Sequence, residues 1–203
     1  MTPTSPARPA RDLALVATMA GLMAALGLVP AIAPFGGAVP ITAQSMGAML
    51  AGALLGPRLG SASMALFLGL VALGLPLLSG GRGGLGAFAG PSIGYLVGFV
   101  AGAFVVGWLT HRLAVRPGGR YVLATGIVVN VVGGVALLYL LGVPATAWRA
   151  DLSLGTATVA ALAFVPGDLI KAVVAAVIAR GVYAAYPGLG PAPRPRPRAA
   201  ADA

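Results

Sequence analysis

Long apolar stretches with almost no ionisable side chains dominate the 203-residue sequence. Hydrophobic residues make up 59% of the chain and charged residues only 8%, whereas soluble globular proteins carry about 25% charged residues. A chain with so few charges could not cover the surface of a soluble fold, and it is too apolar to remain disordered. The sequence therefore predicts a membrane protein.

Six stretches are candidates for helices that cross a hydrocarbon core about 30 Å thick, which takes about 20 helical residues. They cover residues 13–33, 41–56, 59–78, 91–110, 121–142 and 166–183. A further apolar run, residues 152–165, meets Pro166-Gly167, a pair that interrupts a helix already in progress. We expect that run to be a short outer segment, and the sixth span to begin at Pro166, because a first helical turn tolerates proline.

The arginines divide unevenly between the two sides of this map. If the N-terminus is cytoplasmic, ten arginines fall on the cytoplasmic side and only Arg82 and Arg149 on the other, as the positive-inside rule requires. We therefore predict an all-α membrane protein with six transmembrane helices and both termini cytoplasmic. Residues 1–11 form an N-terminal segment, residues 12–186 the membrane domain, and residues 187–203 a disordered, proline- and arginine-rich cytoplasmic tail.

Asp168 and Lys171 are the only charged pair inside a predicted span. Each costs about 2.5–3.5 kcal/mol at the centre of a membrane helix, so such residues mark functional sites by default. Three residues apart on one helix, they share a face and can partly offset each other. The alternative interpretation is a structural ion pair with Asp168 as a capping acid near the start of its helix.

Further polar side chains map to the outer side of the predicted topology. Arg82 lies in a glycine-rich loop, residues 79–86, whose backbone can approach a ligand closely; the alternative is a flexible turn. Gln44 and Thr42 lie at the outer end of the second span, and Tyr95 lies at the outer end of the fourth. Polar groups that converge in an otherwise apolar protein are typical of a small-molecule site. Asn130, in the middle of the fifth span, is instead expected to join two helices.

The first span carries small residues at four-residue spacing, Ala17, Gly21 and Ala25, which let another helix approach closely.

Several other functions are excluded. The chain has one histidine, no cysteine and only four acids, which argues against a metal site. Its single lysine is not part of a phosphate-binding loop, so the chain has no ATPase motif of that kind. We expect no cofactor, no nucleic-acid partner and no enzyme activity.

Four segments in the right order resemble the signatures of the BioY family, the biotin-binding S subunits of energy-coupling-factor transporters. They read VPITAQSMG (residues 39–47), GGRGGLG (80–86), GPSIGYLVGF (90–99) and FVPGDLIKA (164–172). The resemblance covers about residues 12–185.

The resemblance implies a six-helix, multi-pass subunit of the cell membrane. It would bind biotin from outside and deliver it inward with a transmembrane coupling subunit and two ATP-binding-cassette ATPases. Asp168, Lys171, Arg82, Tyr95 and Gln44 would then contact biotin. The small-residue face of the first span would dock the coupling subunit. The alternatives are an S subunit for another vitamin and a structural membrane protein without a ligand.

Overall fold

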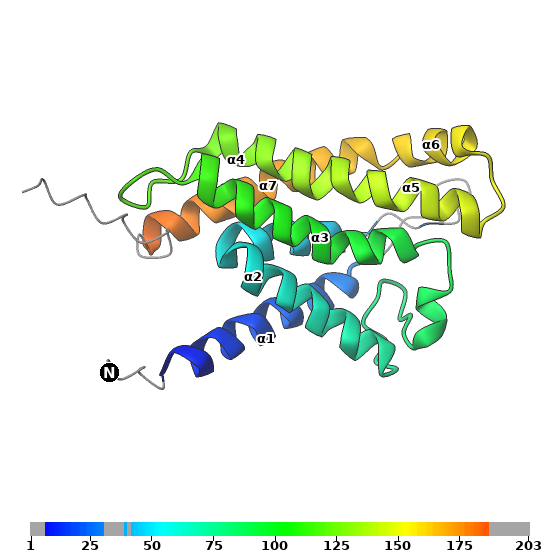
Figure 1. Cartoon of the computed structure of the whole chain (residues 1–203), viewed down its shortest axis with the longest axis horizontal. Coiled ribbons are helices and arrows are strands. Elements are labelled where there is room, and N and C mark those ends of the chain that lie inside the picture. The colour runs from blue at the N-terminus through cyan, green and yellow to red at the C-terminus, as the bar shows by residue number, and fades with distance from the viewer. Residues whose placement is uncertain (1–6, 31–38, 40–41, 187–203) are drawn as a thin grey trace, which may run out of the picture.

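The computed structural model describes residues 7–30, 39 and 42–186, and in that part of the chain it contains helices and two isolated β-bridges but no strand. Figure 1 shows the green, yellow and orange helices running roughly along the long axis, with the blue and teal helices inclined to them. The predicted tail, residues 187–203, lies outside the described residues. The elements are α1 (Ala7–Gly27), α2 (Gln44–Ala72), η2 (Leu85–Phe88), α3 (Ile93–Leu109), η3 (Thr110–Ala114), α4 (Leu123–Val129), η4 (Asn130–Ala136), α5 (Leu137–Arg149), α6 (Leu154–Leu162) and α7 (Val165–Ala185).

The second and third predicted spans are the two arms of α2. Gly56 has a non-helical backbone (φ 78°, ψ −177°) and precedes Pro57, so the helix breaks there. A Cβ atom added to Gly60 would lie 2.7 Å from the carbonyl oxygen of Ala51, although residues nine apart in a continuous helix are separated by about 13 Å. The arms therefore fold back on each other, as the cyan and teal halves of α2 show in Figure 1.

The second arm of α2 ends at Ala72, earlier than the predicted residue 78. Gly74 has φ 105° and Pro76 follows it, so the chain leaves the helix at this point. The residues up to 92 then form a compact loop that includes η2. This loop carries Arg82, and it leads directly into α3.

The fifth predicted span is a continuous helical segment built from α4, η4 and α5, and it extends to Arg149 rather than residue 142. It packs closely on α3, where a Cβ atom on Gly94 would collide with the carbonyl oxygen of Leu141. Asn130, fully buried, donates a hydrogen bond to the carbonyl oxygen of Ala172 on α7, at 3.0 Å. Its predicted role as a link between helices is therefore confirmed.

The short segment before the last span is α6, and α7 follows it after a bend of 54°. Pro166 occupies the first turn of α7, as the sequence predicts. Four described helical segments are long and apolar enough to cross a membrane, and the bent α6–α7 pair adds a fifth. With the arms of α2 taken separately, these segments correspond in number and order to the six predicted spans. The first helix, however, covers Ala7–Gly27 rather than residues 13–33, and it begins within the predicted N-terminal segment of residues 1–11. The all-helical, multi-pass fold is confirmed, whereas the orientation of the termini stays a prediction.

Candidate substrate-binding site

A cavity between the first arm of α2, α3, α5, α7 and the loop after α2 contains all five predicted binding residues. Its lining also shows which side chains surround them. The lining residues are Val39, Thr42, Gln44, Ser45, Leu78, Arg82, Ser92, Tyr95, Leu96, Phe99, Leu138, Tyr139, Phe164, Asp168 and Lys171. Segments more than 120 residues apart in the sequence thus meet at one place, as in the contact of Ser45 with Asp168.

The position of Asp168 follows from the start of α7. Pro166 and Gly167 begin that helix, and Asp168 lies in its first turn, where free backbone N–H groups and the helix dipole favour a carboxylate. Lys171 is one turn further along the same face, and its Nζ lies 2.9 Å from Oδ1 of Asp168. The local sequence therefore accounts for this ion pair.

Three neighbours complete the hydrogen bonds of the ion pair. The hydroxyls of Ser45 and Tyr139 donate to Oδ1 and Oδ2 of Asp168, at 3.0 and 2.6 Å. Lys171 also donates to the carbonyl oxygen of Thr42 and, at 3.3 Å, to Oγ of Ser45. Asp168 is only 7% exposed, so these bonds are needed to hold a carboxylate there. The cluster as a whole carries no net charge.

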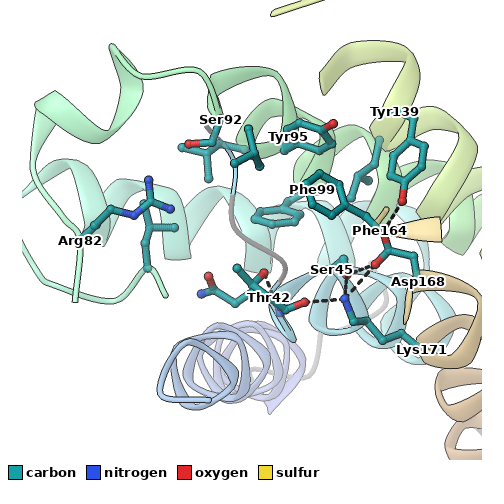
Figure 2. Close-up of a pocket in the computed structure, with 15 residues that line it drawn as sticks. Thr42, Ser45, Arg82, Ser92, Tyr95, Phe99, Tyr139, Phe164, Asp168 and Lys171 are labelled. Carbon is teal, nitrogen blue, oxygen red and sulfur yellow. Dashed lines mark hydrogen bonds and ion pairs between the residues drawn. The ribbon is translucent and has the colours of Figure 1, made fainter. Parts of the chain in front are cut away.

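Arg82 and Ser92 lie on the side of the cavity away from Asp168 and Lys171 (Figure 2). Phe99 lies between these two sides. The Nε–H of Arg82 donates to the carbonyl oxygen of Ser79 at 3.3 Å. Among the described residues, no acid lines the cavity on this side. Ser92 is 5% exposed, and its hydroxyl has no partner among the described residues. This end of the cavity therefore carries a positive charge and an unused hydroxyl.

Gln44 lines the cavity, but its amide already bonds to the backbone. Nε2 donates to the carbonyl oxygens of Met23 and Leu77, at 3.2 and 3.1 Å, and Oε1 accepts from the N–H of Ser79 at 3.1 Å. Gln44 thereby ties the end of α1 to the loop that carries Arg82. Its predicted contact with a ligand stays a prediction.

The turn that holds Arg82 is also fixed by its own backbone. Leu78 and Arg82 form an antiparallel bridge around Gly80 and Gly81, whose φ angles are 78° and 69°. Residues other than glycine rarely adopt such angles. The glycine-rich loop is therefore a defined turn rather than a flexible one.

Apolar and aromatic side chains line the remaining walls of the cavity. Leu78, Leu96, Phe99, Leu138 and Phe164 supply apolar surface. The rings of Tyr95 and Tyr139 meet edge to face, with centroids 6.3 Å apart. The cavity thus combines an apolar middle with two polar ends of different charge, which suits an elongated molecule with one neutral polar end and one anionic end.

Three polar lining residues were not singled out from the sequence as candidates for the site: Ser45, Ser92 and Tyr139. Ser45 and Ser92 lie inside the family-like segments, next to residues that were singled out. Tyr139 gives a weaker signal, because it is a hydroxyl-bearing ring in the middle of an apolar run rather than at its end. Only the tertiary structure shows that its hydroxyl reaches Asp168 on α7.

The predicted docking residues of α1 are exposed. Ala17, Gly21 and Ala25 lie away from the buried positions Ala20 and Met23. A Cβ atom on Gly21 would meet nothing within 4 Å. Within the described part of the chain, no group of three or more His, Cys, Asp or Glu side chains could hold a metal ion.

The chain is similar in sequence to several proteins that are named as biotin transporters. The chain is 47% identical over 178 residues to "Biotin transporter BioY" of Rhizobium etli, an alignment that covers 87% of this chain and 95% of the relative. It is 44% identical over 182 residues to the Rhodobacter capsulatus protein of the same name, with 85% and 93% covered.

A solved structure agrees with these relatives. The crystal structure of "the S-component for biotin from an ECF-type ABC transporter" matches with a TM-score of 0.80 at 32% identity, covering 88% of this chain and 94% of that one. The model of the BioY family matches residues 1–188. The helices, the cavity and these matches all lead to the same conclusion, that the chain belongs to the BioY family.

Proposed function

We propose that this chain binds biotin in the cavity between α2, α3, α5 and α7 and acts as the substrate-binding subunit of a biotin uptake transporter in the cell membrane. The observation that carries the proposal is the difference between the two polar ends of one apolar cavity. Biotin has a ureido ring that is polar but neutral, an apolar thioether body and a carboxylate at the end of its side chain. Each part has a counterpart in the lining.

The ureido ring fits the Asp168–Lys171 cluster. Asp168 accepts hydrogen bonds and Lys171 donates them, so together they match the N–H groups and the carbonyl oxygen of the ring. Because the cluster has no net charge, a neutral group can enter it without leaving a buried charge uncompensated. The 3.3 Å bond from Lys171 to Ser45 is the longest in the cluster and the easiest to exchange for a ligand oxygen.

The carboxylate fits the end with Arg82 and Ser92. Lys171 is already paired with Asp168, whereas Arg82 has no carboxylate among the lining residues. A guanidinium binds a carboxylate through two parallel hydrogen bonds. The two ends lie on opposite sides of Phe99, in line with the elongated shape of biotin (Figure 2). Tyr95 and Gln44 are assigned to orienting contacts.

Calorimetric titration of the purified, detergent-solubilised protein with biotin tests the proposal. We expect biotin to bind saturably and one to one, and we expect thiamine and riboflavin not to displace the bound biotin. Displacement by another vitamin would favour an S subunit of different specificity. If none of the three vitamins binds, the remaining alternative is a structural membrane protein without a ligand.

Delivery into the cell requires an energy source that this chain lacks, so we assign it a coupling subunit and two ATPases as partners. The exposed small-residue face of α1, Ala17, Gly21 and Ala25, is the proposed docking surface, because small side chains allow another helix to approach closely. This face is separated from the cavity by the buried side of α1.

Substituting Ala17→Trp together with Gly21→Trp fills this face with two indole rings. We expect co-purification with the coupling subunit to be lost while biotin affinity stays unchanged. Val128→Trp with Val132→Trp is the matched control, since both valines are exposed and four residues apart on another helix. Equal co-purification of the two double variants would contradict the assignment of α1.

A further inference from the structure

A second, polar pocket lies at the end of the molecule where α4 begins and α7 ends. Its lining comes from the segment of residues 118–123 and from Arg180, Tyr183 and Ala184 of α7. In Figure 1 the loop before α4 and the C-terminal end of α7 lie together at the left end of the helices. None of the lining residues belongs to the biotin cavity described above. Its function is therefore separate from that of the cavity.

The backbone of this pocket is a hydrogen-bonded turn. Val115 and Tyr121 form an antiparallel bridge, and the N–H of Val122 donates to the carbonyl oxygen of Ala114 at 2.8 Å. Gly118 and Gly119, with φ 87° and 78°, close the turn. The position of Arg120 is thus fixed by the backbone on both sides of it.

Two buried tyrosines join this turn to α7. The rings of Tyr121 and Tyr183 stack with centroids 5.3 Å apart and an angle of 20° between their planes. Tyr183 also donates to the carbonyl oxygen of Ala53 on the first arm of α2, at 3.1 Å. Arg120 directly precedes one ring, and Arg180 lies one helical turn before the other. The stack therefore brings two guanidinium groups from separate segments to one pocket.

No carboxylate balances these two arginines in the described part of the chain. The one ion pair found there joins Lys171 and Asp168, and no acid lines the pocket. Both arginines are exposed. Their chain neighbours at this end, Arg112 and Arg116, add further positive charge, and Arg112 stacks on Trp108 with its guanidinium carbon 5.2 Å from the ring centroid.

The pocket also lies at the level where a membrane surface is expected. The apolar segment Leu123–Arg149 begins at its edge, and α7 ends a few residues beyond Arg180. Tyrosine rings favour the boundary between the hydrocarbon and the headgroups. Basic pockets between transmembrane helices at this depth bind the headgroups of anionic lipids.

We propose that Arg120 and Arg180 form a site for the phosphate group of an anionic phospholipid, held against the Tyr121–Tyr183 stack. Guanidinium groups bind phosphate oxygens through paired, charge-assisted hydrogen bonds. The acyl chains of the lipid would lie along the exposed apolar side of α7, which includes Val177 and Ile178. The site anchors the end of the molecule opposite the biotin cavity at one depth in the bilayer.

The test compares Arg120→Gln/Arg180→Gln with the control Arg11→Gln/Arg58→Gln. The control removes the same charge from exposed arginines that do not line the pocket. Delipidated protein is titrated with short-chain phosphatidylglycerol and, separately, with phosphatidylcholine, and retained lipids are counted by native mass spectrometry. We expect one phosphatidylglycerol bound to the natural chain, with affinity at least about tenfold lower in the pocket variant, since the loss of a charge-assisted hydrogen bond to phosphate lowers affinity by about tenfold or more.

The control variant is expected to bind this lipid within about threefold of the natural chain. Equal loss in both double variants would show unspecific attraction to charge and overturn the proposal. Binding of phosphatidylcholine with the same affinity would also overturn it. Inorganic phosphate is the final probe: if it binds as tightly as phosphatidylglycerol, the lipid is not the source of the phosphate. Circular dichroism and biotin titration of each variant establish that the fold is retained.

Discussion

The two polar ends of the cavity between α2, α3, α5 and α7 are built in opposite ways. At one end Asp168 and Lys171 extend from a single helix. Ser45 and Tyr139 donate hydrogen bonds to Asp168, and Lys171 donates one to the carbonyl oxygen of Thr42. At the other end Arg82 is exposed on a loop, and the buried hydroxyl of Ser92 has no partner in the described residues. The first end is complete without a ligand, whereas the second leaves polar groups available.

This difference separates two tasks of one site. A buried ion pair with all its hydrogen bonds made is rigid, because removing any partner leaves a charge without compensation. It is suited to recognise the shape and hydrogen-bonding pattern of a neutral ring. An exposed arginine at the cavity mouth is suited to attract an anion and to hold it with little reorganisation. Substitutions at the two ends should therefore differ in size and in their dependence on the charge of the ligand.

The largest effect is expected from Asp168→Asn. The amide cannot accept hydrogen bonds as the carboxylate does, and the part-buried Lys171 loses its counter-charge. Breaking a buried ion pair in this way costs about 3–5 kcal/mol. We expect biotin affinity to fall by about a hundredfold or more in calorimetric titration. Asp151→Asn, at an exposed acid in the loop before α6, is the control and should bind biotin normally. Similar affinities for the two variants would remove Asp168 from the site.

An intermediate effect is expected from Arg82→Gln, and it should depend on the ligand. Loss of a charge-assisted hydrogen bond costs about 1.5–3 kcal/mol, so biotin should bind about ten- to a hundredfold more weakly. Biotin amide, which has no carboxylate, should bind the variant and the natural chain equally well. Arg149→Gln, the other arginine on the predicted outer side, serves as control. An equal loss for both ligands would place the carboxylate elsewhere.

The smallest effect is expected from Ser92→Ala. One neutral hydrogen bond contributes about 1 kcal/mol, so biotin affinity should fall by about fivefold. The ligand-free protein should be as stable to heat as the natural chain or slightly more stable, because the lost hydroxyl has no partner among the described residues. The control is Ser63→Ala. The buried hydroxyl of Ser63 donates to the carbonyl oxygen of Leu59 in its own helix, and Ser63 does not line the cavity. An unchanged affinity after Ser92→Ala would exclude this contact.

Most of the fold could be predicted from the sequence because apolar length and proline positions are local signals. Pro166-Gly167 separates α6 from α7, and Gly56-Pro57 separates the arms of α2. The predicted positions of the helix ends are less accurate. The last apolar residues before position 78 belong to the loop that carries Arg82, because Gly74 takes φ 105° and ends the helix. The sequence does not distinguish apolar residues that line a cavity from apolar residues that face lipid, because the same residue types serve in both places.

The candidate site could be predicted only in part. Charged residues inside an apolar run are costly, so Asp168 and Lys171 were conspicuous. Gln44 was also conspicuous, but the structure shows it holding the loop through backbone bonds to Met23, Leu77 and Ser79. A polar residue that positions a loop and one that contacts a ligand look alike in sequence, because both are polar exceptions in an apolar segment.

The sequence by itself determined that this chain is a multi-pass helical membrane protein with an ion pair one helical turn apart, because hydrophobicity and helical spacing act over neighbouring residues. Only the tertiary structure decided that Ser45 and Tyr139, from α2 and α5, complete the hydrogen bonds of Asp168. The tertiary structure also decided that Arg120 and Arg180 line one second pocket, beside the stacked rings of Tyr121 and Tyr183. Such contacts join residues tens of positions apart, and they depend on how helices pack, which no local pattern specifies.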